Sequence, residues 1–395
     1  MAPLFLKLFL KNRPTLPGHL LKLKKDLKKK KKLHASLPPH EARIVQDIRN
    51  RTSRLNLNNI TRTKAYLDYY VKFPEIHWAF LGHMVSRNGG WNMTDLKGGL
   101  VGRLLTKEEA EAFFTFLERG NWLIFQDAYP QFLLYEESVK RGRNLFHLLP
   151  HLGVSAFMET VWDYFWKKKD LYTLTVALVV NEQSYLESRV LQNPDFKKNV
   201  FNTLEFLLQD VLSMNHIVFP IRHDGRTELA GLTVHQFESL DKRILLGKKL
   251  YKLLFGDEER FNLVKEWALV NPHTGSRKDY WPHLFNDVEE FAPGSELKPR
   301  IFSCRLAPRA ARIFSPRLEF AWPNQQHPPA EPGDWFTDTD AVHHLIELKD
   351  VVEGEIQQDY CKTLERLDLA AIAKKALLLR NQTNDGSIIL RHLRE

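Results

Sequence analysis

The chain has 395 residues, of which 43% are apolar and 27% are charged. This composition excludes disorder throughout and is sufficient for a large buried core. The formal net charge of +9 is concentrated at one end, because residues 1–33 hold eleven Lys or Arg and one Asp. The remaining residues carry 46 basic and 47 acidic side chains, so the body of the chain is close to neutral.

The cysteines and the absence of common motifs narrow the function classes. Cys304 and Cys361 are too few for a disulfide framework, and their separation fits no zinc pattern. We therefore expect a reducing compartment and a cytoplasmic protein. The sequence has no Gly-rich phosphate loop, dinucleotide fingerprint or His-Glu-x-x-His motif, so it predicts neither a metal nor a cofactor.

Residues 1–37 form a Lys-rich tail that we expect to be disordered or to lie at an interface. Lys7 interrupts the first apolar run and most of the charge follows it, which is unlike a secretory signal. Leu and Phe alternating with Lys fit an anchor on anionic lipid, where each basic residue contributes about 1 kcal/mol. The same lysines would also attract nucleic acid, or would serve solubility alone. The expected membrane-binding residues are Lys22, Lys24, Lys25, Lys28, Lys29, Lys30, Lys31 and Lys32.

Two helices are predicted at 40–53 and 61–71, followed by a stretch dense in polar and aromatic side chains. A third helix should begin at Pro74 and end near residue 87, where Asn88-Gly89-Gly90 tolerates a left-handed stop. Asn92 would then open another helix. The sequence therefore predicts a helix hairpin around the two glycines.

This stretch contains the first candidate site. Glu75, His83 and Arg87 recur on one helix face. One interpretation is a polar pocket in which His83 titrates. The other is a structural hairpin in which Arg87 and Asp95 tie down the glycine turn. The candidate residues are Arg62, Glu75, His83, Arg87, Asn88, Trp91, Asn92 and Asp95.

Clear helix signals follow. Thr106–Glu109 forms a capping box, and the helix it opens should stop at Gly120. Residues 121–141 predict a second, aromatic-rich helix with a kink near Pro130. Ser155 is a further N-cap candidate.

The segment 171–190 begins apolar on all sides, which predicts a helix at the centre of a bundle. Its second half carries the second candidate group, Glu182, Glu187 and Arg189. These residues form either a satisfied structural network or, if a carboxylate is unpaired, a group with a raised pKa suited to acid–base chemistry.

Residues 216–233 predict a small β-hairpin with a turn at His223-Asp224-Gly225. A second capping box at Thr233–Gln236 should open a helix that runs to about Phe255. Asp257 should cap the next helix.

The loop 273–283 is the third candidate site. Ser276, with nearby His and Asp, supplies the ingredients of a hydrolase but lies in no nucleophile elbow. Arg277 could instead bind phosphate or carboxylate, or the loop could be a lid that packs Trp281. The candidate residues here are His273, Ser276, Arg277 and Asp279.

Eight prolines between residues 292 and 338 exclude continuous helix there, and Trp322 and Trp335 indicate that this segment docks on the bundle. A terminal amphipathic helix is predicted around 364–378, with a free tail after Asn381. The sequence thus predicts a mainly α fold, a single multi-helix bundle over 38–395 with a Pro-rich irregular segment and one small β-hairpin.

Four pieces of the chain resemble the YppC-like family of bacterial proteins of unknown function. They are Asn59–Gly98, Leu145–Pro150, Asn181–Arg189 and Asn271–His283. The resemblance spans residues 40 to 345. It implies no activity and no catalytic residues, because the family has none assigned.

Two functions are carried forward. The leading one is a non-enzymatic cytoplasmic protein held at an anionic membrane surface by its basic tail. The alternative is an enzyme or a binder of an anionic metabolite, with a polar pocket built from segments 62–95, 182–189 and 273–283. A nucleic-acid role ranks third because the body is nearly neutral. Whether the protein is an enzyme stays open.

Overall fold

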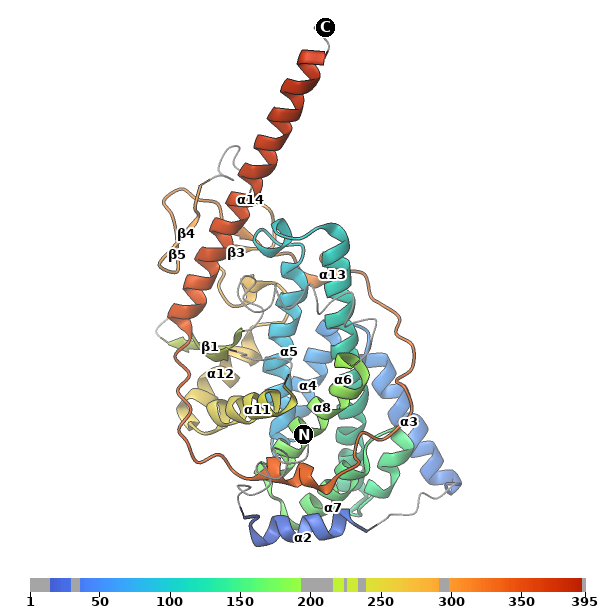
Figure 1. The fold of residues 1–395 in the computed structure, drawn as a ribbon. Coiled ribbons are helices and arrows are strands. Elements are labelled where there is room, and N and C mark those ends of the chain that lie inside the picture. The colour runs from blue at the N-terminus through green and yellow to red at the C-terminus, as the bar shows by residue number, and fades with distance from the viewer. Residues whose placement is uncertain are drawn as a thin grey trace, which may run out of the picture.

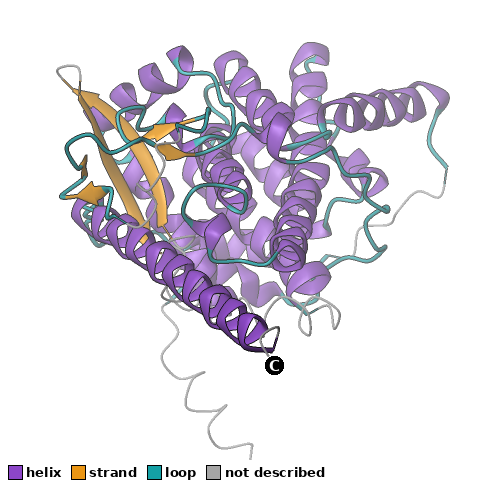
Figure 2. Cartoon of the chain, turned by 90° about the horizontal axis from the view of Figure 1, so that it is seen from above, coloured by secondary structure: helices purple, strands orange, loops and turns teal. Residues whose placement is uncertain are grey.

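The computed structural model describes residues 15–29, 36–192, 216–223, 226–233, 239–290 and 298–392. Most of these residues are helical, and the strands form small two-stranded sheets at one side (Figures 1 and 2). The prediction of a mainly α fold with a small hairpin is confirmed. None of the helices in the described ranges offers an apolar stretch that could span a lipid bilayer.

The first half of the described chain is helical. Its elements are α2 (Gly18–Leu27), α3 (Pro39–Leu55), α4 (Asn59–Lys72), α5 (His77–Asp95), η2 (Val101–Arg103), α6 (Lys107–Arg141), η3 (Phe146–Leu152), α7 (Ala156–Lys168), α8 (Leu171–Leu186) and the π turn η4 (Glu187–Leu191). The second half is mixed. Its elements are β1 (His216–His223), β2 (Arg226–Thr233), α11 (Leu240–Phe255), α12 (Glu258–Val270), η6 (Arg277–Asp279), β3 (Phe285–Asn286), β4 (Ile301–Phe302), β5 (Arg305–Leu306), β6 (Ile313–Phe314), α13 (Leu318–Ala321), η8 (Thr339–Leu345) and α14 (Gln357–His392).

Helix α8 lies inside the bundle and packs against α6, α7 and α11. Its residues Leu174–Asn181 are all buried, as expected for a helix that is apolar on every side. Several predicted N-caps are present, since Thr106, Ser155 and Asp257 each accept a hydrogen bond from the first turn of the helix that follows.

Two predicted helix stops are wrong. Helix α5 runs without a break through Gly89 and Gly90, and α6 runs through Gly120 to Arg141 with Pro130 inside it. At Gly90 the reason is packing, because a Cβ there would clash with Asn59 Oδ1 and lie 2.6 Å from His273 Nε2. Because Gly90 has no side chain, Asn59 and His273 can pack against α5 at this position, and the glycine does not end the helix.

The predicted hairpin is confirmed as the antiparallel pair β1–β2, although its turn residues 224–225 lie outside the described residues. Asn88 of α5 fastens the hairpin to the bundle. Its Nδ2 donates to Val218 O (3.0 Å), and Val218 N donates to its Oδ1 (2.9 Å). The helix expected from residue 234 begins instead at Leu240, with Ser239 as its cap, and residues 234–238 lie outside the description.

The described part of the N-terminal tail differs from the expected disordered or interfacial segment. Residues 18–27 form α2, which packs on α7 and η8 and buries Leu20, Leu23 and Leu27. Their three- and four-residue spacing makes an apolar stripe, which the body covers. Lys24 Nζ also pairs with Asp340 Oδ1 at 2.9 Å. Residues 1–14 and 30–35, including Lys30, Lys31 and Lys32, lie outside the described residues.

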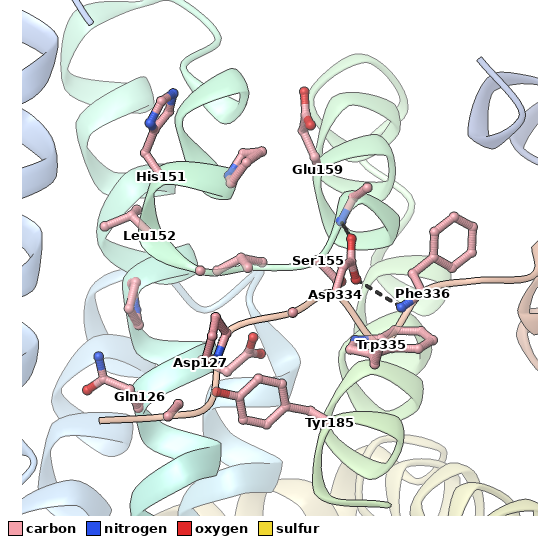
Figure 3. A pocket seen from close by; sticks show the side chains of 18 of the residues that line it. Gln126, Asp127, His151, Leu152, Ser155, Glu159, Tyr185, Asp334, Trp335 and Phe336 are labelled. Atoms are coloured by element: carbon pink, nitrogen blue, oxygen red, sulfur yellow. Dashed lines mark hydrogen bonds between the residues drawn. The ribbon is translucent and has the colours of Figure 1, made fainter. Parts of the chain in front are cut away.

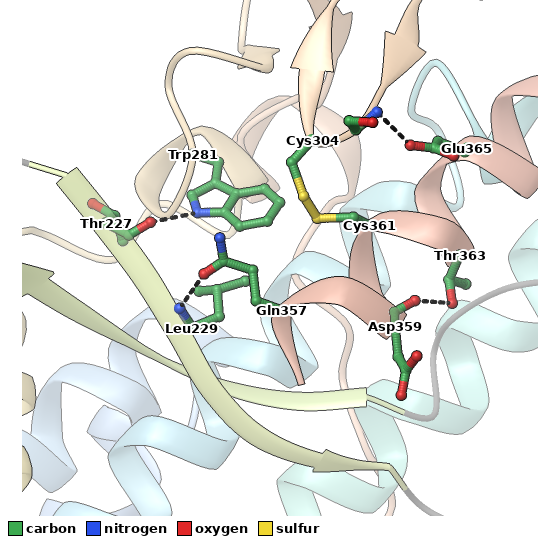
Figure 4. Close-up of a disulfide and its surroundings, with 10 residues drawn as sticks. Thr227, Leu229, Trp281, Cys304, Gln357, Asp359, Cys361, Thr363 and Glu365 are labelled. Atoms are coloured by element: carbon green, nitrogen blue, oxygen red, sulfur yellow. Dashed lines mark hydrogen bonds between the residues drawn. A yellow bond between two sulfur atoms is a disulfide. The ribbon is translucent and has the colours of Figure 1, made fainter. Parts of the chain in front are cut away.

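The two cysteines are paired with each other. Cys304, in the turn between β4 and β5, forms a disulfide with Cys361 of α14, with 5.2 Å between their Cα atoms (Figure 4). The argument from cysteine usage for a reducing compartment therefore no longer holds. Helix α14 itself continues to His392, past the end expected near residue 380.

Candidate functional site

A cavity of about 1860 Å³ lies between α3, α6, η3, α7 and a Pro-rich strap, residues 327–337 (Figure 3). The strap is the part of the irregular segment that crosses the bundle. A hollow of this size exceeds most small-ligand sites. The side chains on its floor and over its mouth decide what it could hold.

Asp127 of α6 lies on the floor and is 4% exposed. Its Oδ2 accepts hydrogen bonds from Gln131 Nε2 (3.0 Å) and Asn181 Nδ2, whereas its Oδ1 has no partner. Burial raises the pKa of Asp127 to about 7, although the hydrogen bonds and Arg189 favour the charged form. This carboxyl can therefore gain or lose a proton near neutral pH.

Asn181 connects this carboxyl to the strap. Besides donating to Asp127, its Oδ1 accepts from Ser155 Oγ (2.8 Å) and from Trp335 Nε1 (2.9 Å). Trp335 belongs to the strap and Ser155 caps α7. A single amide thus joins three walls of the cavity.

Further polar contacts hold the strap in place. Asp334 Oδ2 accepts from the backbone N–H of Ala156 (2.8 Å), at the positive end of α7 (Figure 3). Arg189 Nη2 donates to Gly333 O at 2.6 Å, and Arg119 Nη1 donates to Pro328 O at 2.7 Å. The strap is therefore fixed through its backbone at several points.

The charges around the cavity are mixed but lean acidic. The acidic lining residues are Glu41, Asp127, Glu159, Glu331 and Asp334, and the Lys and Arg residues are Lys29, Arg49 and Arg189. Three histidines, His147, His151 and His327, also line it. Glu41 Oε1 is 3.2 Å from His147 Nε2, so one acid at the mouth already has a partner.

Glu182 neighbours the floor, close enough to Asp127 for the two charges to repel. Burial, first of all, raises its pKa to about 7, against hydrogen bonds from Gln183 and Trp78, and the charge of Asp127 adds to the rise. Both carboxyls, of which Asp127 lines the cavity, therefore favour their protonated forms at slightly acid pH.

A second polar cluster contains four of the predicted site residues, Trp91, Asp95, Ser276 and Arg277, and lines no part of this cavity. Arg277 donates through Nε to Asp95 Oδ2 (2.6 Å) and through Nη1 to the hydroxyl of Tyr360, and it lies 4.0 Å from the Trp91 ring. Burial alone would lower the pKa of Arg277, but the Asp95 carboxylate beside it raises the pKa overall. Ser276 Oγ donates to Ser315 O at 2.6 Å. This cluster is a buried structural tie between α5, the 273–283 loop and α14.

Next to it, Arg87 donates to the carbonyls of Asn271 (2.8 Å) and Pro272 (3.1 Å) just after α12 and stacks on Trp267. Asp279 accepts from Thr274 within the loop. These contacts satisfy backbone groups at a helix end and in a turn.

The histidines of these segments are buried. His83 donates from Nδ1 to Thr63 O (2.8 Å), and burial, together with Arg87, lowers its pKa well below the ordinary value. His273 donates from Nε2 to Asn59 Oδ1 at 2.7 Å. Neutral, enclosed imidazoles of this kind do not titrate near pH 7.

The predicted sites are thus brought together only in part. Segments 62–95 and 273–283 meet in the buried cluster, whereas segment 182–189 lies apart from it and contributes Tyr185 and the candidate Arg189 to the cavity lining. The remaining candidates pair separately: Arg62 with Glu118, Glu75 with Tyr135, and Glu187 with Arg243. Among the described residues, no group of three His, Cys, Asp or Glu could hold a metal ion.

Sequence reasoning missed Asp127, Asn181, Ser155 and Trp335 as one site. One signal was present: Asp127 is a carboxylate in the middle of an aromatic, core-like stretch of α6. A charged residue in such a position is rare unless it has a partner or a role.

The fold and the cavity define a mainly helical protein with a strap-covered pocket and a buried carboxyl on its floor. The sequence profile of the family described as "Protein of unknown function (DUF2515)" matches residues 54–359, and the chain belongs to this family. The uncharacterized protein YppC of Bacillus subtilis (strain 168) is 44% identical over 237 residues, which are 60% of this chain and 73% of that protein. The resemblance to a YppC-like family is thereby confirmed. No solved structure matches the chain.

Proposed function

We propose that this protein binds a small polar molecule in the strap-covered cavity, with Asp127 as the group that anchors it. The observation that carries the proposal is that Asp127 lines the cavity and that its Oδ1, an enclosed carboxyl oxygen, has no hydrogen-bond partner. An unpaired buried acceptor is costly, and a ligand that donates a hydrogen bond to it would remove that cost.

The lining favours a neutral or cationic donor over the anionic metabolite expected from the sequence. Acidic residues outnumber Lys and Arg around the cavity, and Arg189 is already engaged with the strap. A hydroxyl, amide or ammonium group suits an ionised carboxylate, whereas a second anion would face repulsion.

Titration calorimetry with spermidine as the cationic probe and citrate as the anionic probe tests this proposal. Spermidine should bind about tenfold more tightly at pH 8 than at pH 6, because Asp127 ionises between them. Asp127→Asn should abolish this pH dependence, while Asp68→Asn on the exposed surface of α4 should not. Tighter binding of citrate, or binding unaffected by Asp127→Asn, contradicts the proposal.

Membrane association through the N-terminal lysines is a second candidate. It is favoured by the outward face of α2, where Lys22, Lys25, Lys28 and Lys29 are exposed. The leucines of this helix are already buried, so the attraction would be purely electrostatic and strongly weakened by salt. Lys22→Glu combined with Lys25→Glu should then reduce binding to anionic vesicles at low salt.

A further inference from the structure

A surface on the far side of the molecule from α2 combines exposed apolar and basic side chains. It is formed by the β4–β5 hairpin and the outer face of α14, which extends beyond the body (Figure 1). Phe302 is 75% exposed, Leu369 is 53% exposed and Leu377 is 61% exposed. Large apolar groups in water at these levels, grouped on two adjoining elements, indicate a contact surface.

The hairpin is held rigidly against α14. The Cys304–Cys361 disulfide joins the two, and the Ser303 amide donates to Glu365 Oε1 at 2.6 Å (Figure 4). Ser303 and Cys304 both have positive φ, 48° and 61°, as in the tight hairpin turns that usually require Gly or Asn. The disulfide and the Ser303–Glu365 hydrogen bond thus fix both residues of the strained turn on α14, and the hairpin is held in one orientation.

The register of the hairpin directs its side chains. Phe302 lies directly opposite Arg305 in the ladder, so the two share one face. The alternate residue, Ile301, is 5% exposed and packs inward. Leu369 lies one helical turn beyond Glu365, which holds the hairpin turn, so it adjoins the same surface.

The surrounding charge is mostly positive, although the exposed Asp359 pairs with Lys362 at 3.6 Å and Glu365 binds the hairpin turn. Between Lys298 and Arg317 the sequence has no acidic residue, and between Arg366 and Arg380 its only acid is Asp368. Asp368 is 1% exposed and pairs with Arg300 at 2.8 Å. The exposed basic residues of this surface are Lys298, Arg305, Arg309, Lys362 and Arg366.

We propose that this hairpin–helix surface docks on an anionic membrane surface. Basic groups would lie at lipid phosphates while Phe302, Leu369 and Leu377 enter the headgroup region, the combination found in interfacial helices. Nucleic acid fits less well, because single strands need several aromatic platforms and only one aromatic ring, Phe302, stands out here. Helix α2 fits less well too, because its leucines are covered.

Sedimentation of the full chain with vesicles tests this assignment. The chain should bind vesicles of phosphatidylcholine and phosphatidylglycerol and should leave pure phosphatidylcholine in solution. Phe302→Ser with Leu369→Ser should weaken binding by about tenfold or more, and Arg305→Glu with Arg309→Glu should do the same. The matched control is Phe320→Ser on α13, where a ring that is 78% exposed lies outside this surface.

Thermal melts should be alike for all these variants, because every substituted side chain is exposed. Four results would overturn the proposal: no binding to anionic vesicles, undiminished binding by the Phe302→Ser/Leu369→Ser variant, loss of binding with Lys22→Glu/Lys25→Glu instead, or binding of a labelled oligothymidine in preference to vesicles. Each of these results would mean that this surface does not bind an anionic membrane, or that another part of the chain does.

Discussion

The molecule contains two buried polar clusters that look alike in sequence and differ in structure. Around Arg277, the charges are paired, stacked on rings and enclosed. Around Asp127, one carboxyl oxygen has no partner and the side chain lines a hollow. A polar group kept among core residues therefore has two explanations, a tie between elements or a binding group. Both clusters contain a buried polar atom without a hydrogen-bond partner, Trp91 Nε1 in the first and Asp127 Oδ1 in the second, so the difference is that Asp127 lines a cavity and the Arg277 cluster does not.

The largest expected effect concerns the first cluster. Arg277→Met would leave the Asp95 carboxylate buried and unpaired, and should cost about 3–5 kcal/mol of unfolding free energy. Urea denaturation measures this. Arg312→Met, which breaks an ion pair on the surface, is the control and should leave the transition midpoint nearly unchanged. Equal effects of the two substitutions would mean that the Arg277 cluster is not a structural tie.

The disulfide is next to this cluster in the sequence, because Cys361 follows Tyr360, whose hydroxyl accepts from Arg277. Its bonded residues are 57 positions apart in the chain. Cys304→Ser should lower stability by about 4 kcal/mol in the chain-entropy picture. The wild type in a reducing agent should show the same loss, while the variant should not respond to the reductant. A wild type that is indifferent to reduction would contradict this.

Unlike the two preceding substitutions, Asp127→Asn should increase the stability of the protein at high pH. Burial raises the pKa of Asp127 from its ordinary value of 3.8 to about 7, so the folded state holds a proton that the unfolded state has lost. Wild-type stability from this group therefore falls as pH rises from 4 towards 7 and then levels off. The unfolding free energy of the variant, relative to that of the wild type, should therefore increase by about 3 kcal/mol from pH 5 to pH 8. Chemical denaturation at several pH values measures this difference. A difference between the two unfolding free energies that does not change with pH would argue against a pKa near 7 for Asp127.

The smallest expected effects on stability come from alanine substitutions at two helix glycines, and these effects should have opposite signs. Gly90→Ala would push a methyl group against Asn59 and His273 in the paired cluster and should cost about 1–3 kcal/mol. Gly120→Ala meets nothing within 4 Å and should stabilise α6 by about 0.5–1 kcal/mol. Thermal melts of the two variants should thus shift in opposite directions. A shift in the same direction would undo the packing explanation for Gly90.

Local signals in the sequence predicted what depends on local chemistry. Thr106, Ser155 and Asp257 cap their helices because each side chain bonds within its own first turn. Gly90 was misread because its cause lies in residues 59 and 273, which sequence spacing cannot bring together. The Asp127 site was missed for the same reason, since Asn181 and Trp335 reach it only through the tertiary fold. The disulfide likewise depends on a long-range approach of two elements.

Carbon-13 NMR titration of the aspartate carboxyl groups, with Asp127→Asn used for assignment, tests the central claim most directly. Asp127 should titrate with a pKa of about 7 in the free protein, and spermidine should lower this pKa because it favours the ionised form. An Asp127 pKa in the ordinary range near 4, or one that spermidine leaves unmoved, would contradict the assignment of this cavity as the binding site.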